Sequence, residues 1–169
     1  MDIYKFAMQM ELDGKAFYEK GAAAADDENL KQIFLTLAEE EQRHYDIFKR
    51  LDAGELKAAE DFTKNRGKTI ATTKNLFRKM TEAGQDTLPG DDVRAVWKEA
   101  VGIEEKSEKF YREQAAKEKD AERKSILNRI ADEEKNHIYL IDNMLSFLKD
   151  PQTFVASSQF ASFKSWEGR

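Results

Sequence analysis

The sequence has no cysteine, only two prolines and only two histidines among its 169 residues. Without cysteine, the chain cannot form disulfides, thiolate metal sites, iron–sulfur clusters or thiol nucleophiles. No apolar run is long enough to cross a membrane as a helix, and no signal peptide is recognisable. The net charge of −5 argues against a nucleic-acid partner, whose phosphates require a basic surface. We therefore expect a protein of the cytoplasm that binds neither membranes nor nucleic acid.

The spacing of apolar and charged residues along the sequence predicts mainly long amphipathic helices. Charged residues make up 36% of the chain and apolar residues 40%, which is typical of helices with one solvated face. Apolar residues recur at helical spacing in four segments. These segments predict helices over Ile3–Ala24, Glu28–Leu51, Asp91–Lys117 and Glu122–Leu148. Short polar turns join the first helix to the second and the third to the fourth, so each pair is predicted to be an antiparallel hairpin.

A long connection, Asp52–Leu88, separates the two hairpins and is predicted to contain a short helix around Ile70–Met80. Two helical hairpins joined by one long crossover have the connectivity of ferritin-like bundles. We therefore predict an all-α, ferritin-like four-helix bundle over residues 1–150. The tail, residues 151–169, is expected to pack on the bundle or on a neighbouring subunit through its aromatic residues Phe154, Phe160, Phe163 and Trp166.

Both histidines lie in Glu-x-x-His motifs that repeat at a fixed interval. The motif Glu41/His44 recurs 93 residues later as Glu134/His137, from 41 to 134 and from 44 to 137. An isolated glutamate on the preceding helix repeats at the same interval, from 11 to 104. Each half of the chain therefore offers one lone glutamate, followed by a glutamate and a histidine one helical turn apart. The six candidate ligands are Glu11, Glu41, His44, Glu104, Glu134 and His137.

These acids occupy positions where the helical period requires an apolar residue. Burying an isolated carboxylate costs several kcal/mol, and like charges add repulsion. Two divalent cations would balance four carboxylates, while the histidines add neutral nitrogen donors. Such a set of ligands suits iron or manganese, and zinc as well. The alternative is that the acidic runs are solvated helix faces. The repeat favours the two-metal site, and it favours Glu104 over Glu105 because Glu104 matches Glu11.

Two further residue pairs repeat at the same interval. Tyr18 and Tyr111 are either ordinary core aromatics or donors whose hydroxyls orient the carboxylates from behind. Gly14 and Ser107 follow the lone glutamates by three residues. Small residues there either leave room for metals and an oxidant or allow close helix packing.

Together these motifs resemble the rubrerythrin branch of the ferritin-like superfamily, over roughly residues 1–149. The resemblance implies a four-helix bundle with two non-haem iron ions and peroxide- or dioxygen-linked iron chemistry. It also implies a division of the ligands between the metals. Glu11 and His44 would bind one iron, Glu104 and His137 the other, and Glu41 and Glu134 would bridge the pair.

The sequence departs from that family in two respects. Rubrerythrins proper carry a rubredoxin-like domain with four cysteines, so here electrons would come from an external donor such as a separate rubredoxin-type protein. Rubrerythrins also carry an extra glutamate one turn after the lone glutamate of the third helix. Ser107 stands at that position, with Glu108 one residue away. This substitution argues against efficient peroxidase turnover.

Three functions fit these features. The first is a di-iron oxidoreductase that reacts with hydrogen peroxide or dioxygen, in oxidative-stress defence or ferrous iron oxidation. The second is an iron-binding or iron-buffering protein without dedicated turnover, and the third is a bundle with structural metal. The aromatic tail favours a homodimer over a large shell of subunits, which places the oxidoreductase ahead of storage.

Overall fold

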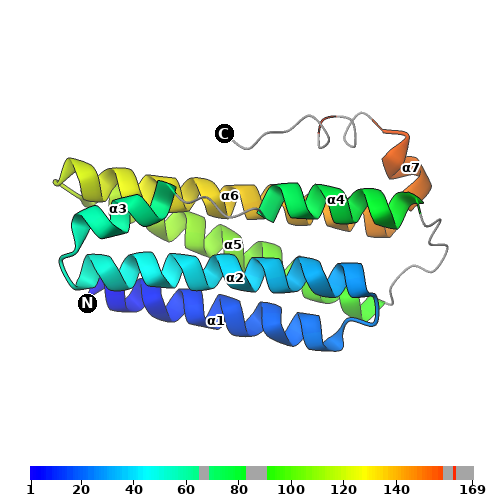
Figure 1. Ribbon diagram of the computed structural model, residues 1–169, viewed down its shortest axis with the longest axis horizontal. Helices are drawn as coiled ribbons and strands as arrows, with labels where there is room; N and C mark the ends of the chain where they lie inside the picture. The colour runs from blue at the N-terminus through cyan, green and yellow to red at the C-terminus, as the bar shows by residue number, and fades with distance from the viewer. Residues whose placement is uncertain (65–68, 83–90, 158–161, 163–169) are drawn as a thin grey trace.

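The computed structural model describes residues 1–64, 69–82, 91–157 and 162. Its framework is four long helices, which lie side by side in Figure 1: α1 (Ile3–Ala24), α2 (Glu28–Asp52), α5 (Asp91–Lys117) and α6 (Ala121–Lys149). Helices α1 and α2 form one hairpin, and α5 and α6 form the other. The described residues contain no strand. The predicted all-α architecture of two hairpins is confirmed.

Matching caps fix where the second helix of each hairpin begins. The Asp27 side chain accepts hydrogen bonds from the backbone N–H groups of Asn29 and Leu30. Asp120 caps α6 in the same way by accepting from Arg123. The two aspartates lie at the 93-residue interval, from 27 to 120. Because an N-cap satisfies backbone donors that have no helical partner, the repeat extends to the local signals that start the helices.

Two short helices occupy the crossover between the hairpins. The predicted helix around Ile70–Met80 is present as α4 (Thr69–Glu82), whose Leu76 and Met80 are buried in the core. A second helix, α3 (Leu56–Lys64), was not predicted. It packs between α2 and α6 (Figure 1), and its Thr63 hydroxyl accepts a hydrogen bond from Arg129 of α6. A helix this short does not display enough turns for its period to stand out.

The chain after α6 folds back as a single short turn of helix, α7 (Pro151–Val155). Asp150 caps it, and Pro151 occupies its first turn, where the missing N–H is not needed. The ring of Phe154 is buried and packs edge-on against Phe147 of α6, with centroids 6.1 Å apart. The chain therefore contacts the bundle at Phe154. The other aromatic residues of the predicted tail contact, Phe160, Phe163 and Trp166, lie outside the described residues.

Apolar layers close the bundle core on both sides of the polar candidate ligands. One layer includes Tyr18, Phe34 and Trp97, and the rings of Phe34 and Trp97 stack at 4.1 Å. The other includes Phe48 and Tyr111. On each long helix, the candidate ligands lie between residues of one layer and residues of the other. In the part of the chain that the structure describes, no helix is long and apolar enough to span a membrane.

Candidate metal centre

All six predicted ligands lie in the bundle core, contributed by all four long helices. Each is at most 4% exposed, and His44 and Glu134 are fully buried. Glu105, the neighbour of Glu104, is exposed, in agreement with the choice made from the repeat. The buried set is Glu11 from α1, Glu41 and His44 from α2, Glu104 from α5, and Glu134 and His137 from α6.

The side chains form two groups that share two carboxylates. In each group, one potential ligand atom from every residue lies within 4.8 Å of the others. Glu41 and Glu134 belong to both groups. The two imidazoles face each other with ring centroids 5.8 Å apart. The first group adds Glu11 and His44 to the shared pair, and the second adds Glu104 and His137.

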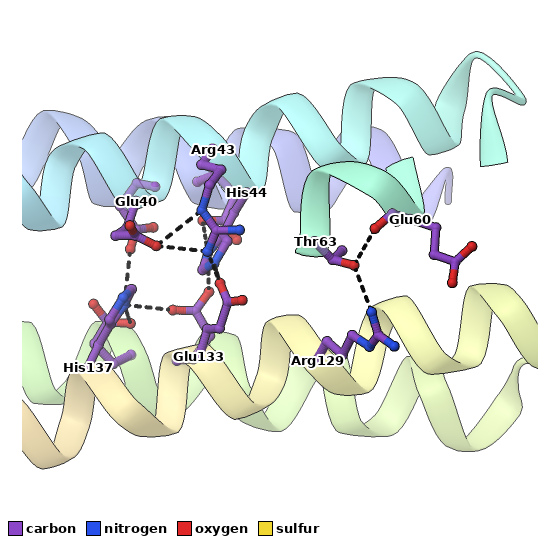
Figure 2. A network of polar contacts seen from close by, with 12 residues as sticks. Glu40, Arg43, His44, Glu60, Thr63, Arg129, Glu133 and His137 are labelled. Atoms are coloured by element: carbon purple, nitrogen blue, oxygen red, sulfur yellow. Dashed lines mark hydrogen bonds and ion pairs between the residues drawn. The ribbon is translucent and has the colours of Figure 1, made fainter. Parts of the chain in front are cut away.

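Both histidines point the same ring nitrogen, Nδ1, at the carboxylates. His44 Nδ1 lies 3.1 Å from an oxygen of Glu134 and 3.5 Å from an oxygen of Glu11. His137 Nδ1 lies 3.3 Å from Glu134 and 3.4 Å from Glu104. Figure 2 shows His44 and His137 extending from facing helices toward this shared centre. Each Nδ1 is therefore placed to act as a metal donor.

Most of the converging atoms have no hydrogen-bond partner. Buried polar groups are normally hydrogen-bonded, because leaving one unsatisfied costs about 1–3 kcal/mol, and more if it is charged. A cation among these atoms would satisfy them together, so the residues fit the metal pair that their chemistry implies. The unsatisfied atoms are Glu11 Oε2, Glu41 Oε1, both oxygens of Glu134, His44 Nδ1 and His137 Nδ1.

In the metal-free cluster, burial and neighbouring charges raise the pKa values of several carboxyl and imidazole groups, so that these groups keep protons. Burial, reinforced by Glu11, raises the pKa of Glu134 to about 8 and raises the pKa of Glu41 well above its usual range. Burial alone would lower the pKa of His137, but Glu104 and Glu134 outweigh it and bring the value to about 10. At neutral pH, protons therefore do part of the charge balancing that metal ions would take over.

The two tyrosines hold the lone glutamates across the bundle. The Tyr18 hydroxyl donates to Glu104, and the Tyr111 hydroxyl donates to Glu11, so each bond joins the two halves of the repeat. Burial and the adjacent carboxylates raise the pKa of both tyrosines well above its usual range, which keeps both hydroxyls protonated as donors. Each lone glutamate thus has one oxygen held in place by a tyrosine.

The family comparison agrees with this geometry. Residues 2–145, most of the chain, match the family model described as Rubrerythrin. The chain belongs to the rubrerythrin family. Comparisons with curated proteins and with solved structures return no match. Membership of the rubrerythrin family, together with the buried glutamate and histidine groups, indicates a di-iron type of metal site.

The position of the additional rubrerythrin glutamate is occupied by a small residue. Ser107 is buried, whereas Glu108 is partly exposed and pairs with Arg112 at 3.5 Å. Glu108 therefore does not substitute for the missing carboxylate. In the other half of the repeat, a Cβ placed on Gly14 would lie only 2.7 Å from Glu41 Oε2. Gly14 thus provides the room that the shared Glu41 carboxylate occupies.

A second set of polar residues beside the cluster was not predicted from the sequence. Arg43 donates to Glu40 at 2.8 Å and also to Glu133, and Glu133 lies 2.7 Å from His44 Nε2 (Figure 2). Burial alone would raise the pKa of Glu133, but the hydrogen bond and charge of His44, with Arg43, bring it to about 2. The repeat could have pointed to both glutamates. Glu40 and Glu133 are separated by the same 93-residue interval, and each directly precedes a shared glutamate.

Proposed function

We propose that this protein is a non-haem di-iron oxidoreductase that reduces hydrogen peroxide or dioxygen. Two iron ions would lie in the two groups described above, with manganese or zinc as possible substitutes. In this assignment Glu11 and His44 hold one ion and Glu104 and His137 hold the other. Glu41 and Glu134, which belong to both groups, would be shared between the two ions.

The sharing of two carboxylates between two buried groups is the observation that carries the proposal. A single metal that takes one atom from each residue of its group would leave the histidine of the other group and one oxygen of Glu134 without a partner. Two divalent ions bring four positive charges against four carboxylates, and the two neutral imidazoles do not disturb that balance. Two metal ions held by these residues would together supply the two-electron chemistry that a small oxidant requires.

The residues would act mainly by holding and enclosing the metals. When bound in the ferrous state, the pair supplies two electrons, which with two protons convert one hydrogen peroxide molecule into two waters. Tyr18 and Tyr111 keep the lone glutamates in position by the hydrogen bonds they donate. The apolar layers on either side limit the access of water to the cluster.

Re-reduction requires a source of electrons outside these residues, since the sequence contains no cysteine with which to bind a rubredoxin-type iron. We propose a separate electron-donor protein of the rubredoxin type as the partner. We further propose that the protein acts as a homodimer in the cytoplasm.

An iron-binding or iron-buffering protein is the second candidate. The observation that favours it is the pairing of Glu108 with Arg112, which leaves Ser107 at the position of the extra rubrerythrin ligand. A site without that ligand can still bind and oxidise iron while turning over peroxide slowly. The two candidates differ in the rate at which repeated additions of peroxide are consumed.

Rapid mixing of the anaerobic, ferrous-loaded protein with one equivalent of peroxide tests the proposal. Oxidation within seconds is expected, with a visible absorption band that disappears when a reductant is added. His137→Ala, which lacks one proposed donor, should show little of this band. If wild-type iron is oxidised no faster than free ferrous iron, the oxidoreductase proposal is wrong. Rapid oxidation without renewed consumption after reduction would favour iron buffering.

A further inference from the structure

The two histidines of the cluster differ in what holds the outer ring nitrogen. His44 Nε2 lies 2.7 Å from Glu133, a carboxylate of the facing helix α6. No described residue makes such a contact with His137 Nε2, and the contacts of His137 are those of Nδ1 with the cluster. His44 is fully buried, while His137 is 4% exposed. The repeat therefore does not extend to the surroundings of the two imidazoles.

Arg43 explains why the two halves differ. Its guanidinium donates to both Glu40 and Glu133 and so draws these two carboxylates to the same side of the cluster, next to His44. The position equivalent to Arg43 in the second half, 93 residues later, is Asn136, whose shorter and uncharged side chain cannot do the same. Glu40, the counterpart of Glu133, is engaged by Arg43 on its own helix, α2.

We propose that Glu133, held by Arg43, positions His44 so that the His44 metal position is the tighter of the two and fills first. The proposal rests on the di-metal site proposed above and adds an order of filling. It treats Glu133 and Arg43 as positioning residues, because they act on the metal through the imidazole of His44.

The physical basis is the neutral form in which an imidazole binds metal. A neutral imidazole carries its single proton on one of its two nitrogens. An acceptor at Nε2 keeps the proton on that nitrogen, so that Nδ1, which faces the cluster, is the nitrogen that gives up its proton to metal. The same contact fixes the ring plane. His137 has no such fixed acceptor among the described residues, so binding must select both its tautomer and its orientation. Partners of this kind change metal affinity by about 10- to 100-fold.

Stepwise titration of metal-free protein with cobalt(II), followed by calorimetry and visible absorption, measures the two positions separately. We expect two steps in the wild type, with the tighter step lost in His44→Ala and the weaker step lost in His137→Ala. Glu133→Gln keeps an acceptor oxygen but removes its charge, whereas Glu133→Leu removes both. The tighter step should weaken by up to about tenfold in Glu133→Gln and by about 10- to 100-fold in Glu133→Leu. The weaker step should not change.

Glu39→Gln is the matched control, because Glu39 is exposed on the same stretch of α2 and its substitution removes the same charge. It should leave both steps unchanged. Thermal unfolding of the metal-free variants separates local positioning from a general loss of stability, which would weaken both steps together.

Several outcomes would overturn the inference. The first is a wild type that binds cobalt in two steps of equal affinity. The second is a Glu133 substitution that weakens the weaker step or changes neither step. The third is a Glu40→Gln variant that weakens the weaker step as much as Glu133→Gln weakens the tighter one. The last result would mean that the two histidines are supported symmetrically. A wild-type protein that binds no cobalt would instead contradict the di-metal site itself, and with it the proposed function.

Discussion

The contact between Gly14 and Glu41 makes a quantitative prediction about the shared carboxylate. A Cβ at position 14 would lie 2.7 Å from Glu41 Oε2, and ordinary contact begins at 3.4 Å, so in Gly14→Ala this oxygen must retreat by about 0.7 Å (3.4 − 2.7). Metal–ligand distances are held to within about 0.2 Å. The displacement exceeds this tolerance, so Glu41 cannot keep its geometry toward a metal at that oxygen.

We therefore expect Gly14→Ala to weaken metal binding by roughly 10- to 100-fold, which corresponds to about 1.4 kcal/mol for each factor of ten. The metal-free protein should fold normally, because the displaced atom is the end of a flexible side chain. Alanine also favours a helix over glycine by about 1 kcal/mol, which offsets part of the strain. Gly14→Ala should therefore lower metal affinity and leave the stability of the metal-free protein nearly unchanged.

Gly102→Ala is the matched control. Gly102 also lies within a long helix, but a Cβ added there meets nothing within 4 Å. Cobalt(II) calorimetry on the metal-free proteins measures affinity, and chemical denaturation measures stability. Gly102→Ala should bind metal like the wild type and be more stable by up to about 1 kcal/mol. If Gly14→Ala binds metal as tightly as Gly102→Ala, then Glu41 is not a metal ligand in the arrangement described.

Three further predictions concern packing, orientation and protons. Gly21→Ala should destabilise the metal-free protein by about 1–3 kcal/mol in denaturation experiments, because its Cβ would lie 2.7 Å from the buried ring of Phe34; a stability gain would contradict this packing. Tyr18→Phe removes the hydrogen bond to Glu104 and should lower metal affinity by about tenfold with little change in fold, and unchanged affinity would refute a positioning role. Since the pKa of Glu134 is raised to about 8, this group is protonated at pH 7 and must lose its proton to metal, as must the histidines. Affinity should therefore rise with pH from 6 to 8, with release of about two or more protons per metal pair in weakly buffered solution; release of none would contradict the assignment.

The sequence was sufficient for the long helices and for which residues gather at the centre. The ends of α1 and α5 agree with the predicted ends, and those of α2 and α6 differ by one residue at most. The ends of a long helix can be predicted from the sequence when its apolar period is regular and capping residues flank it. The repeat also identified Glu104, and not its exposed neighbour Glu105, as the buried acid, because a buried position must match in both halves.

Other features depended on contacts that periodicity does not describe. Helix α3 is short, and its position depends on packing against α2 and α6. Glu40 lies in an acidic run that suggests a solvated face, yet it is only 7% exposed because Arg43 pairs with it. The tyrosine bonds cross between the two halves of the chain, so neither half alone indicates which carboxylate receives them. Such contacts are set by the packing of the hairpins.

Counting the metal bound per chain tests the central claim most directly. Protein loaded with ferrous iron without oxygen, freed of excess metal and analysed for iron and protein, should contain two iron ions per chain. His44→Ala and His137→Ala should each contain about one. One ion or none in the wild type, or two in both variants, would contradict a centre in which Glu41 and Glu134 are shared between two metals.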